Sequence, residues 1–519
     1  MIKARQAGDT AVLFDTSDPP AWLAAAINAA DLPGVRDVVP GARTVLVIIE
    51  PGSIPLDELA AAVVSLPVIE PEAGETGLVE IPVVYDGPDL ADVARLAQMS
   101  VDEVIARHSG GLYTVGWLGF APGFGYLTGL DQRLSGVPRL DTPRVAVPAG
   151  SVAIAAGLAA VYPSASPGGW RLLGRTTVRT WDVDREPPAL FSPGAKVRFV
   201  ASIGGRSMSS QRHQTFPDVP QVTSGKATGP RIEVVRPGPF ATVQDLGRPG
   251  SAAFGVPPSG AADSASLTAA NRLVGNADGT AGIELTLGRA TFRCHGGLRL
   301  AVTGAPAEVV LAAGTDQPTL AIEFGASFEV LDGGLVSIGA PAAGLRTYVA
   351  VSGGLATPTV LGSRSVDVLS GLGGGALQAG DVLAIGSDRR AESIPQVPGP
   401  AIPGRGTVAR LQVMAGPRID WFGADALDTL CDSIYTVSPA SNRTGLRLTG
   451  PPLPRLTGRE LPSEGMVTGS IEVPPDGQPI LLLADHPTVG GYPVIAVVAT
   501  TDLAIAAQLR PGDKISFAD

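Results

Sequence analysis

The chain has 519 residues, of which 45% are hydrophobic and 17% are charged, and its net charge is −11. A chain of this length exceeds one hydrophobic core, so three or four domains are expected. The negative charge and the scarcity of lysine, with only Lys3, Lys196, Lys226 and Lys514, argue against nucleic acid or an anionic membrane as partner.

Glycine and proline, 66 and 47 residues, are scattered between short runs of Val, Ile and Leu. This pattern is typical of many short strands joined by tight turns and predicts a mainly β protein. Cys294 and Cys431 have no metal or disulfide spacing. Because the first residues lack the apolar core of a signal peptide, and no apolar run is long enough for a membrane span, we expect a cytoplasmic protein.

The first 80 residues alternate strand-like and helix-like patterns. Thr44–Glu50 is predicted as a strand, and Ala21–Ala30 and Asp57–Leu66 are predicted as helices. This pattern predicts an α+β domain over residues 1–80.

Residues 81–203 are expected to form a second, mainly β domain. It begins with two helices between Asp89 and Gly110, where Ser100 and Glu103 have the spacing of a capping box. Short strands follow from about Tyr113. Residues 204–230, rich in Ser, Gly, Gln and Pro, are predicted to be a linker.

A second strand-rich body is predicted over residues 231–392, with one helix from Asp263 to Leu273, where Asp263 occupies an N-cap position. A Pro-rich break from Ser393 separates it from a last domain, 393–519. The sequence therefore predicts four domains and one linker.

Three landmarks recur in the same order in the second and last domains. Gly-Ser, then Gly-Gly-aromatic, then Pro-Gly-x-Lys occur at Gly150, Gly168 and Pro193, and again at Gly469, Gly490 and Pro511. Similar spacing of the same landmarks predicts two copies of one β-architecture. The glycine pairs either allow a close packing approach or present backbone to a ligand.

Several chemistries are disfavoured by the motifs. The chain has no Walker motif, no GxSxG and no Met-Lys-Met turn for biotin attachment, and its four histidines lack metal spacing. The remaining candidates for functional residues are arginines, carboxylates and glycines.

The first half contains candidate anion-binding residues around its Gly-Gly pair. In PRLDTPRVAVPAGS two arginines flank Asp141 and lead to Gly150-Ser151. A guanidinium matches carboxylate or phosphate with two parallel donors. Pairing of these arginines with surface carboxylates is the alternative. The candidates are Arg139, Arg144, Ser151, Gly168, Gly169 and Arg175.

The second half offers further candidates in TVQDLGRPG, SNRTGLRLTG, LPSEGMVTGS and LADHPTVGGYP. Its carboxylates suit Mg²⁺ binding or proton transfer, with turn formation as the alternative. The anion-binding candidates are Arg248, Arg443, Gly490 and Gly491, and the catalytic candidates are Asp245, Glu464 and Asp485.

Two long sets of motifs carry a family resemblance. GFAPGFGYLTGL and YPSASPGGWRLLGRT resemble the KipI type, which is the B-type component of 5-oxoprolinase or allophanate hydrolase subunit 1. GPFATVQDLGRPG, GVPPSGAAD, ANRLVGN and LPSEGMVTGSIEVPPDGQPI resemble the KipA type, which is the C-type component of 5-oxoprolinase or allophanate hydrolase subunit 2. The chain is thus similar to a natural fusion of both. The resemblance implies several cyclophilin-like β-barrel domains, one in the B-like half and two in the C-like half. Gly157-Leu158-Ala159-Ala160 departs from the polar segment that relatives often carry there.

The resemblance implies an ATP- and Mg²⁺-dependent reaction on a small amide. In 5-oxoprolinase, the B-type and C-type components phosphorylate the lactam oxygen of 5-oxoproline, and ring opening to glutamate is completed by a separate A-type component (LamB/YcsF type). The homologous pair in urea carboxylase takes CO₂ from biotin, which here would sit on a separate carrier protein. A non-catalytic KipI/KipA-like regulator is the third alternative. A homo-oligomer is compatible with all three, and the site is expected between the two halves.

Overall fold

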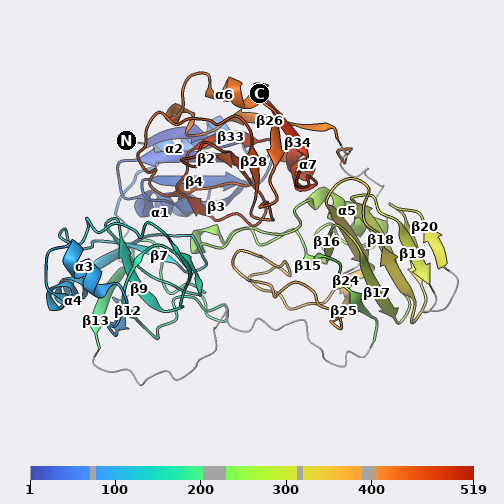
Figure 1. The fold of residues 1–519 in the computed structure, drawn as a ribbon, viewed down its shortest axis with the longest axis horizontal. Coiled ribbons are helices and arrows are strands. Elements are labelled where there is room, and N and C mark those ends of the chain that lie inside the picture. Colours follow the sequence, from blue (N-terminus) through green and yellow to red (C-terminus); the bar gives the residue numbers. More distant parts are fainter. Residues whose placement is uncertain (1, 71–77, 203–228, 313–318, 389–401, 405) are drawn as a thin grey trace.

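The computed structural model describes residues 2–70, 78–202, 229–312, 319–388, 402–404 and 406–519. The expected linker, 204–230, falls almost entirely outside these ranges. The described chain is mostly β and forms four sheet-based units, as Figure 1 shows. Within the described ranges, no helix combines the length and the apolarity that crossing a bilayer requires.

The N-terminal unit is a four-stranded antiparallel sheet whose two faces are both covered. Val12 and Phe14 pack with the helices on one face, whereas Ala11 and Leu13 belong to a core on the opposite face. The alternation of side chains along a strand produces this two-sided burial. The sheet order is β1-β2-β4-β3, and the elements are β1 (Ile2–Gln6), β2 (Ala11–Thr16), α1 (Pro20–Ala30), β3 (Val35–Pro40), β4 (Thr44–Ile49) and α2 (Leu56–Ser65).

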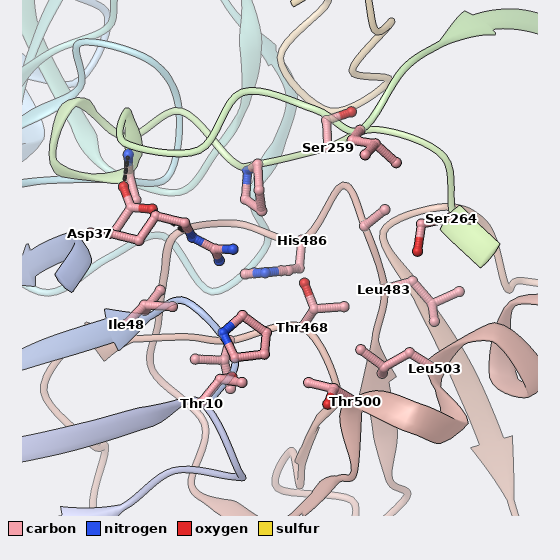
Figure 2. A pocket seen from close by; sticks show the side chains of 18 of the residues that line it. Thr10, Asp37, Ile48, Ser259, Ser264, Thr468, Leu483, His486, Thr500 and Leu503 are labelled. Atoms are coloured by element: carbon pink, nitrogen blue, oxygen red, sulfur yellow. Dashed lines mark hydrogen bonds and ion pairs between the residues drawn. The ribbon is translucent and has the colours of Figure 1, made fainter. Parts of the chain in front are cut away.

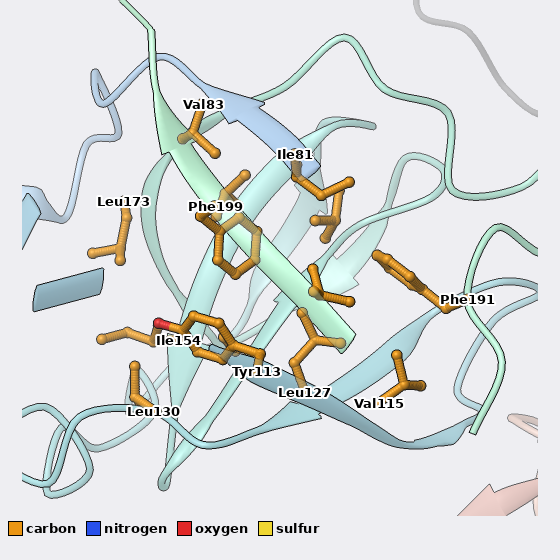
Figure 3. Packing of buried hydrophobic residues seen from close by; sticks show 14 of the residues in the cluster. Ile81, Val83, Tyr113, Val115, Leu127, Leu130, Ile154, Leu173, Phe191 and Phe199 are labelled. Carbon is orange, nitrogen blue, oxygen red and sulfur yellow. The ribbon is translucent and has the colours of Figure 1, made fainter. Parts of the chain in front are cut away.

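The second unit is a barrel filled by apolar side chains (Figure 3). Its seven-stranded sheet has the order β12-β9-β10-β7-β6-β13-β5, and mutual hydrogen bonds of 2.9 Å between Val84 and Arg175 join the two ends. Ser100 caps α4 through Glu103 N, as predicted. The elements are β5 (Val79–Val83), α3 (Leu90–Leu96), α4 (Val101–Gly110), β6 (Tyr113–Leu118), β7 (Gly125–Thr128), β8 (Arg144–Val147), β9 (Ser151–Ala155), β10 (Leu158–Val161), β11 (Ser166–Gly168), β12 (Arg171–Arg175) and β13 (Lys196–Ala201).

The third unit consists of two sheets that share one core, where the sequence analysis expected a barrel. The sheets have the orders β20-β19-β22-β17-β14-β25-β24 and β15-β16-β23-β18-β21. The N-cap predicted at Asp263 is present, 2.9 Å from Ser266 N. The elements are β14 (Arg231–Arg236), β15 (Phe240–Gln244), η1 (Ala252–Phe254), α5 (Ser264–Leu273), β16 (Gly282–Thr286), β17 (Ala290–His295), β18 (Leu298–Gly304), β19 (Val309–Ala312), β20 (Thr319–Ile322), β21 (Ser327–Val330), β22 (Leu335–Ile338), β23 (Arg346–Val351), β24 (Gly353–Leu355) and β25 (Val382–Asp388).

The last unit is a closed barrel with the order β26-β33-β30-β31-β28-β27-β34. Its elements are β26 (Val408–Ala415), η2 (Ile419–Trp421), α6 (Ala426–Asp432), β27 (Tyr435–Val437), β28 (Gly445–Thr449), β29 (Glu464–Gly465), β30 (Ser470–Glu472), β31 (Ile480–Leu482), β32 (Val489–Gly490), β33 (Val494–Val498), η3 (Thr500–Asp502), α7 (Leu503–Ala507) and β34 (Lys514–Ala518).

The two barrels have the same topology, which explains the sequence repeat. In each, the last strand pairs in parallel with the first, β13 with β5 and β34 with β26. The two-stranded β8–β11 sheet of the first barrel corresponds to the two-stranded β29–β32 sheet of the last. The first glycine of each pair lies on an equivalent strand of these sheets, where a Cβ on Gly168 would lie 2.3 Å from the Tyr162 hydroxyl and one on Gly490 would lie 2.7 Å from Met466 Cε. Close packing therefore explains why the first residue of each pair is a glycine.

The N-terminal unit docks on the last barrel, although these are the two ends of the chain (Figure 1). One continuous apolar cluster contains residues of the N-terminal sheet, the outer face of the first barrel and the outer face of the last barrel. Ala42 N donates to Ser463 O at 2.7 Å, and a Cβ on Gly465 would lie 2.5 Å from Leu46 Cβ. The B-like and C-like halves are thus packed into each other.

A buried ion cluster reinforces this contact. Arg418 donates from Nη2 to Asp15 at 2.6 Å and from Nε to both oxygens of Glu464 at 2.8 and 2.9 Å. Burial by itself would lower the pKa of Arg418, but its hydrogen bonds to Glu464 and Asp15 raise it above its usual range. The cation is therefore held by one carboxylate from each end of the chain.

Replacing Arg418 by Gln should destabilise this contact strongly, because Glu464 would remain buried without its cation. Removing one partner of a buried pair costs about 3–5 kcal/mol, and we expect a loss of that order in the free energy of unfolding measured in urea. Arg299→Gln is the matched control, since Arg299 and Glu329 are 54% and 63% exposed and such pairs contribute at most about 1 kcal/mol. Equal effects of the two substitutions would contradict the assigned role.

Candidate active site

A cavity of about 430 Å³ lies where the N-terminal unit, the third unit and the last barrel meet. Figure 2 shows Asp37 and Thr10 entering from the N-terminal unit, Ser259 and Ser264 from the third unit, and His486 from the last barrel. Cavities of this size at domain junctions are the usual location of small-molecule sites.

Asp245 shapes the wall that the third unit contributes. Its carboxylate accepts hydrogen bonds from Gly247 N at 2.8 Å, Ser363 Oγ at 2.6 Å and Arg364 N at 2.7 Å, and it also contacts Ser365 Oγ. This carboxylate, which the sequence analysis proposed as catalytic, therefore fastens the loop after β15 to the loop of residues 363–365.

Arg248 follows on the same loop and lines the cavity. The residue is only 1% exposed, and its Nη2 and Nε donate to the carbonyls of Ser365 and Val360. Its Nη1 is buried without a hydrogen-bond partner among the described residues. Burial lowers the pKa of Arg248, while Asp367, Asp245 and Asp485 act in the opposite direction. A buried guanidinium with a free donor is suited to an anionic ligand group.

Two more residues of the cavity lining contain such an atom. Arg36 Nε and Thr488 Oγ1 are buried and have no hydrogen-bond partner in the described part of the chain, although Arg36 Nε lies 3.6 Å from Asp37 Oδ2. The neighbouring Asp37 accepts from Gly250 N at 3.0 Å and Ala252 N at 3.1 Å and so holds η1 against the N-terminal unit. Burial raises the pKa of Asp37.

A second ion cluster lies beside the cavity and joins the third unit to the last barrel. Arg443 binds both oxygens of Asp485 at 2.8 and 2.9 Å and reaches Glu284 at 2.6 Å. Although burial alone acts against both charges, Arg443 and Arg346 lower the pKa of Glu284, and Asp485 and Glu284 raise the pKa of Arg443. Asp485 also accepts from Ser259 Oγ at 2.7 Å. The cluster therefore positions two cavity-lining neighbours, Ser259 and His486.

The structure brings only part of the predicted site together. Arg248 lines the cavity, and Arg443, Asp485 and Asp245 support it. Within the described residues, the other candidates are not part of its lining.

The candidates of the first barrel are not in the lining of this cavity. Arg144 pairs with Asp89 at 2.7 Å and Arg175 with Asp86 at 2.8 Å, both within the first barrel, and Ser151 Oγ donates to Pro148 O at 2.7 Å. The remaining first-barrel candidates outside the cavity lining are Arg139, Gly168 and Gly169. Short-range pairing with nearby carboxylates, the alternative considered for these arginines, describes Arg144 and Arg175.

Glu464 is also outside the cavity lining, because it is committed to Arg418 in the contact between the N-terminal unit and the last barrel. It pairs in the two-stranded β29–β32 sheet with Gly490, which Gly491 follows directly after β32.

The carboxylates do not form an Mg²⁺ site. The oxygens of Asp245, Glu464 and Asp485 are occupied by N–H and O–H donors, and the described residues contain no group of three or more metal-ligating side chains. We therefore derive no step through a protein-bound metal.

Sequence reasoning missed most residues of the cavity wall. Nothing in the local pattern marks Arg36, Asp37, Thr488 or Ser259, because their role depends on contacts between distant segments. His486 adjoins the candidate Asp485 in LADHPTVGGYP, but the sequence pattern assigns it no role of its own.

Comparison with known proteins assigns the family. Residues 254–519 match the model "Carboxyltransferase domain, subdomain A and B", and residues 2–191 match "Carboxyltransferase domain, subdomain C and D". The chain belongs to this carboxyltransferase domain family. It joins in one chain a half that is similar to the B-type component and a half that is similar to the C-type component of 5-oxoprolinase.

The relatives support this assignment. The chain is 36% identical to the C-type component of 5-oxoprolinase from Escherichia coli over 289 residues, 55% of this chain and 90% of the relative. It is 41% identical to the B-type component from Escherichia coli O157:H7 over 204 residues, 37% of this chain and 93% of the relative. The crystal structure of TTHA0988 matches with a TM-score of 0.84 and 33% identity, covering 100% of both chains.

Urea amidolyase from Lachancea kluyveri is also similar, with 34% identity over 314 residues, 55% of this chain and 17% of the relative. The two components of 5-oxoprolinase and urea amidolyase are enzymes or parts of enzymes, which supports an enzymatic role for this chain.

Asp367, which is buried near Asp485 and Arg248, makes the stability of the fold depend on pH. Burial, together with the nearby Asp485, raises the pKa of Asp367 to about 6. Since this pKa lies above its unfolded value of 3.8, the native state loses stability as pH rises through about 6. Asp367→Asn cannot ionise, so its stability relative to wild type should rise between pH 5 and pH 8, by about 1 kcal/mol.

Urea unfolding at both pH values measures this difference. Asp92→Asn, at an exposed position paired with Arg95, is the control and should show no such trend. An Asp367→Asn effect that is the same at both pH values would refute the assigned ionisation.

Proposed function

We propose that this chain is the fused B/C component of an ATP-dependent 5-oxoprolinase and that the cavity binds the lactam substrate. The reaction is phosphorylation of the lactam oxygen of 5-oxoproline, and ring opening to glutamate is completed by a separate A-type component. The family and the coverage of both component types by one chain support this proposal.

The observation that carries the proposal is Arg248, which lines the cavity and whose buried Nη1 has no hydrogen-bond partner among the described residues. 5-Oxoproline carries a carboxylate at neutral pH, whereas urea carries no charge. A desolvated guanidinium that has only carbonyl partners and one unpaired nitrogen costs free energy unless an anion pairs with it. Arg248 therefore favours an acidic amide over urea as the substrate.

The closure of the cavity by both halves also supports the proposal. The N-terminal unit of the B-like half supplies Arg36 and Asp37, and the two C-like units supply Arg248 and His486. A site assembled in this way needs both component types. It also limits the access of water to the phosphorylated intermediate, which would otherwise hydrolyse.

In the proposed step the lactam oxygen forms a bond to the γ-phosphorus of ATP as the bond from that phosphorus to ADP breaks. Phosphorylation gives an inert amide carbon a leaving group. Arg248 orients the substrate through its carboxylate, and Arg36 and Thr488 offer further donors to it or to the phosphoryl oxygens.

A carboxyltransferase acting on urea or a related amide is the second candidate. The family description and the similarity to urea amidolyase favour it. The required biotin would be carried by another protein, which would have to present it at this cavity.

ADP release by the purified chain with Mg-ATP tests the proposal. We expect 5-oxoproline to stimulate release and urea to have no effect, with the largest stimulation when an A-type component is present. Stimulation by neither, followed by carboxyl transfer from carboxylated biotin to an amide, would replace the proposal by the second candidate.

Arg248→Lys tests the carboxylate contact. Lysine keeps the positive charge but loses the planar set of donors, so KM for 5-oxoproline should rise about 10- to 100-fold, the equivalent of one charged hydrogen bond. The control ligand is 2-pyrrolidone, the same lactam without the carboxylate, whose binding should be weak and equal in both proteins. An equal loss for both ligands would mean that Arg248 does not contact the carboxylate.

A further inference from the structure

We infer that His486 accepts the amide N–H proton of the substrate at its Nε2 atom. This inference rests on the proposed function, but it applies to any substrate whose reacting amide carries an N–H. It adds a base to a site in which the carboxylates proposed from the sequence are held by other groups.

The tautomer of His486 is set by its own main chain. Nδ1 lies 2.8 Å from the carbonyl oxygen of Pro487, and a carbonyl oxygen only accepts hydrogen bonds. Nδ1 therefore carries the ring proton. In a neutral ring this leaves the lone pair on Nε2.

The ring is held in its neutral form. The residue is only 2% exposed, and burial lowers the pKa of His486, although the Pro487 carbonyl and Asp485 oppose this effect. Arg36, Asp37 and Arg248 are the charged residues that line the cavity with it. The negative charge of Asp485 is already neutralised by Arg443.

The position of the ring suits a base. Figure 2 shows the His486 side chain extending into the middle of the cavity, near Thr468 and facing the N-terminal unit. Within the described chain, Nε2 has no hydrogen-bond partner. The backbone is fixed by His486 N donating to Leu483 O at 3.1 Å and by the ion cluster around Asp485.

Removal of the N–H proton makes the amide oxygen a better nucleophile. As Nε2 takes the proton, the N–H electron pair forms a C=N bond and the carbonyl electron pair forms the new O–P bond. The γ-phosphorus–oxygen bond to ADP breaks, which gives ADP, an O-phosphorylated imidate and a protonated His486. In carboxyl transfer the same proton removal would free the nitrogen to attack CO₂.

The histidine tautomer can be measured without turnover. The chain has four histidines, so ¹⁵N NMR of histidine-labelled protein is tractable, and His486→Gln identifies the relevant signals. At pH 7 we expect Nδ1 to be protonated and Nε2 to be unprotonated. Saturating 5-oxoproline should shift the Nε2 signal, and N-methyl-5-oxoproline, which has no N–H, should not shift it. A protonated Nε2 in the free protein, or equal shifts with both ligands, would overturn the inference.

Kinetics give the second readout. His486→Gln keeps a hydrogen-bonding side chain but no proton acceptor of comparable basicity, so kcat should fall about 100-fold or more, with KM changed less than about threefold. In wild type, kcat/KM should fall as pH drops through the lowered pKa of His486, because the protonated ring cannot accept a proton. This acid limb should be absent in His486→Gln.

His295→Gln is the matched control, since His295 lies on β17 beside Glu233, outside the cavity lining, and should behave as wild type. An unchanged kcat or a retained acid limb in His486→Gln would overturn the inference. If wild type does not turn over 5-oxoproline at all, the proposed function fails, and the tautomer and the two-ligand comparison still decide the role of His486.

Discussion

The geometry of the candidate site depends on the burial of Arg443. This guanidinium binds Asp485 through two nitrogens, Glu284 through a third contact and the carbonyl of Gly260. Removing a charge from water costs several kcal/mol unless oriented partners replace the water. The partners come from both C-like units, so the last barrel and the third unit can satisfy this charge in only one relative arrangement. Ser259 and His486 owe their positions in the cavity to that arrangement.

The two barrels carry an ion pair at equivalent positions, but the pair has a different role in each barrel. In the first barrel Asp89, after Gly87 and Pro88, pairs with Arg144. In the last barrel Arg418, after Gly416 and Pro417, pairs with Glu464. Arg144 and Glu464 occupy equivalent positions, since Arg144 lies opposite Gly168 and Glu464 lies opposite Gly490. The positive charge is therefore on the strand in the first barrel, whereas the negative charge is on the strand in the last barrel. Only the second pair also binds a residue of the N-terminal unit, Asp15, and so contributes to assembly of the two halves.

This assembly gives a physical reason for a fused chain. The N-terminal unit packs on the last barrel through the shared apolar cluster and also reaches η1 of the third unit through Asp37. A cavity closed by these contacts is complete only when both halves are present. Covalent linkage keeps the halves at a high effective concentration, which favours the closed arrangement without any new contact.

Local signals in the sequence determined much of the fold. The helices near residues 21–30, 57–66 and 264–273, the caps at Ser100 and Asp263, and the repeat of glycine landmarks all depend on residues close in the chain, and these predictions are confirmed. The sequence also determined the family, since its motifs are long. Tertiary structure decided which charged residues share a site. An arginine binds whichever carboxylate the fold brings near, so Arg144 and Arg175 are paired within the first barrel, while Arg248 lines the cavity and keeps one nitrogen without a partner among the described residues. Contacts between segments hundreds of residues apart, such as Asp37 with Gly250 or Ser259 with Asp485, have no local signature, because the pairing energy depends on distance in space and not on position in the chain.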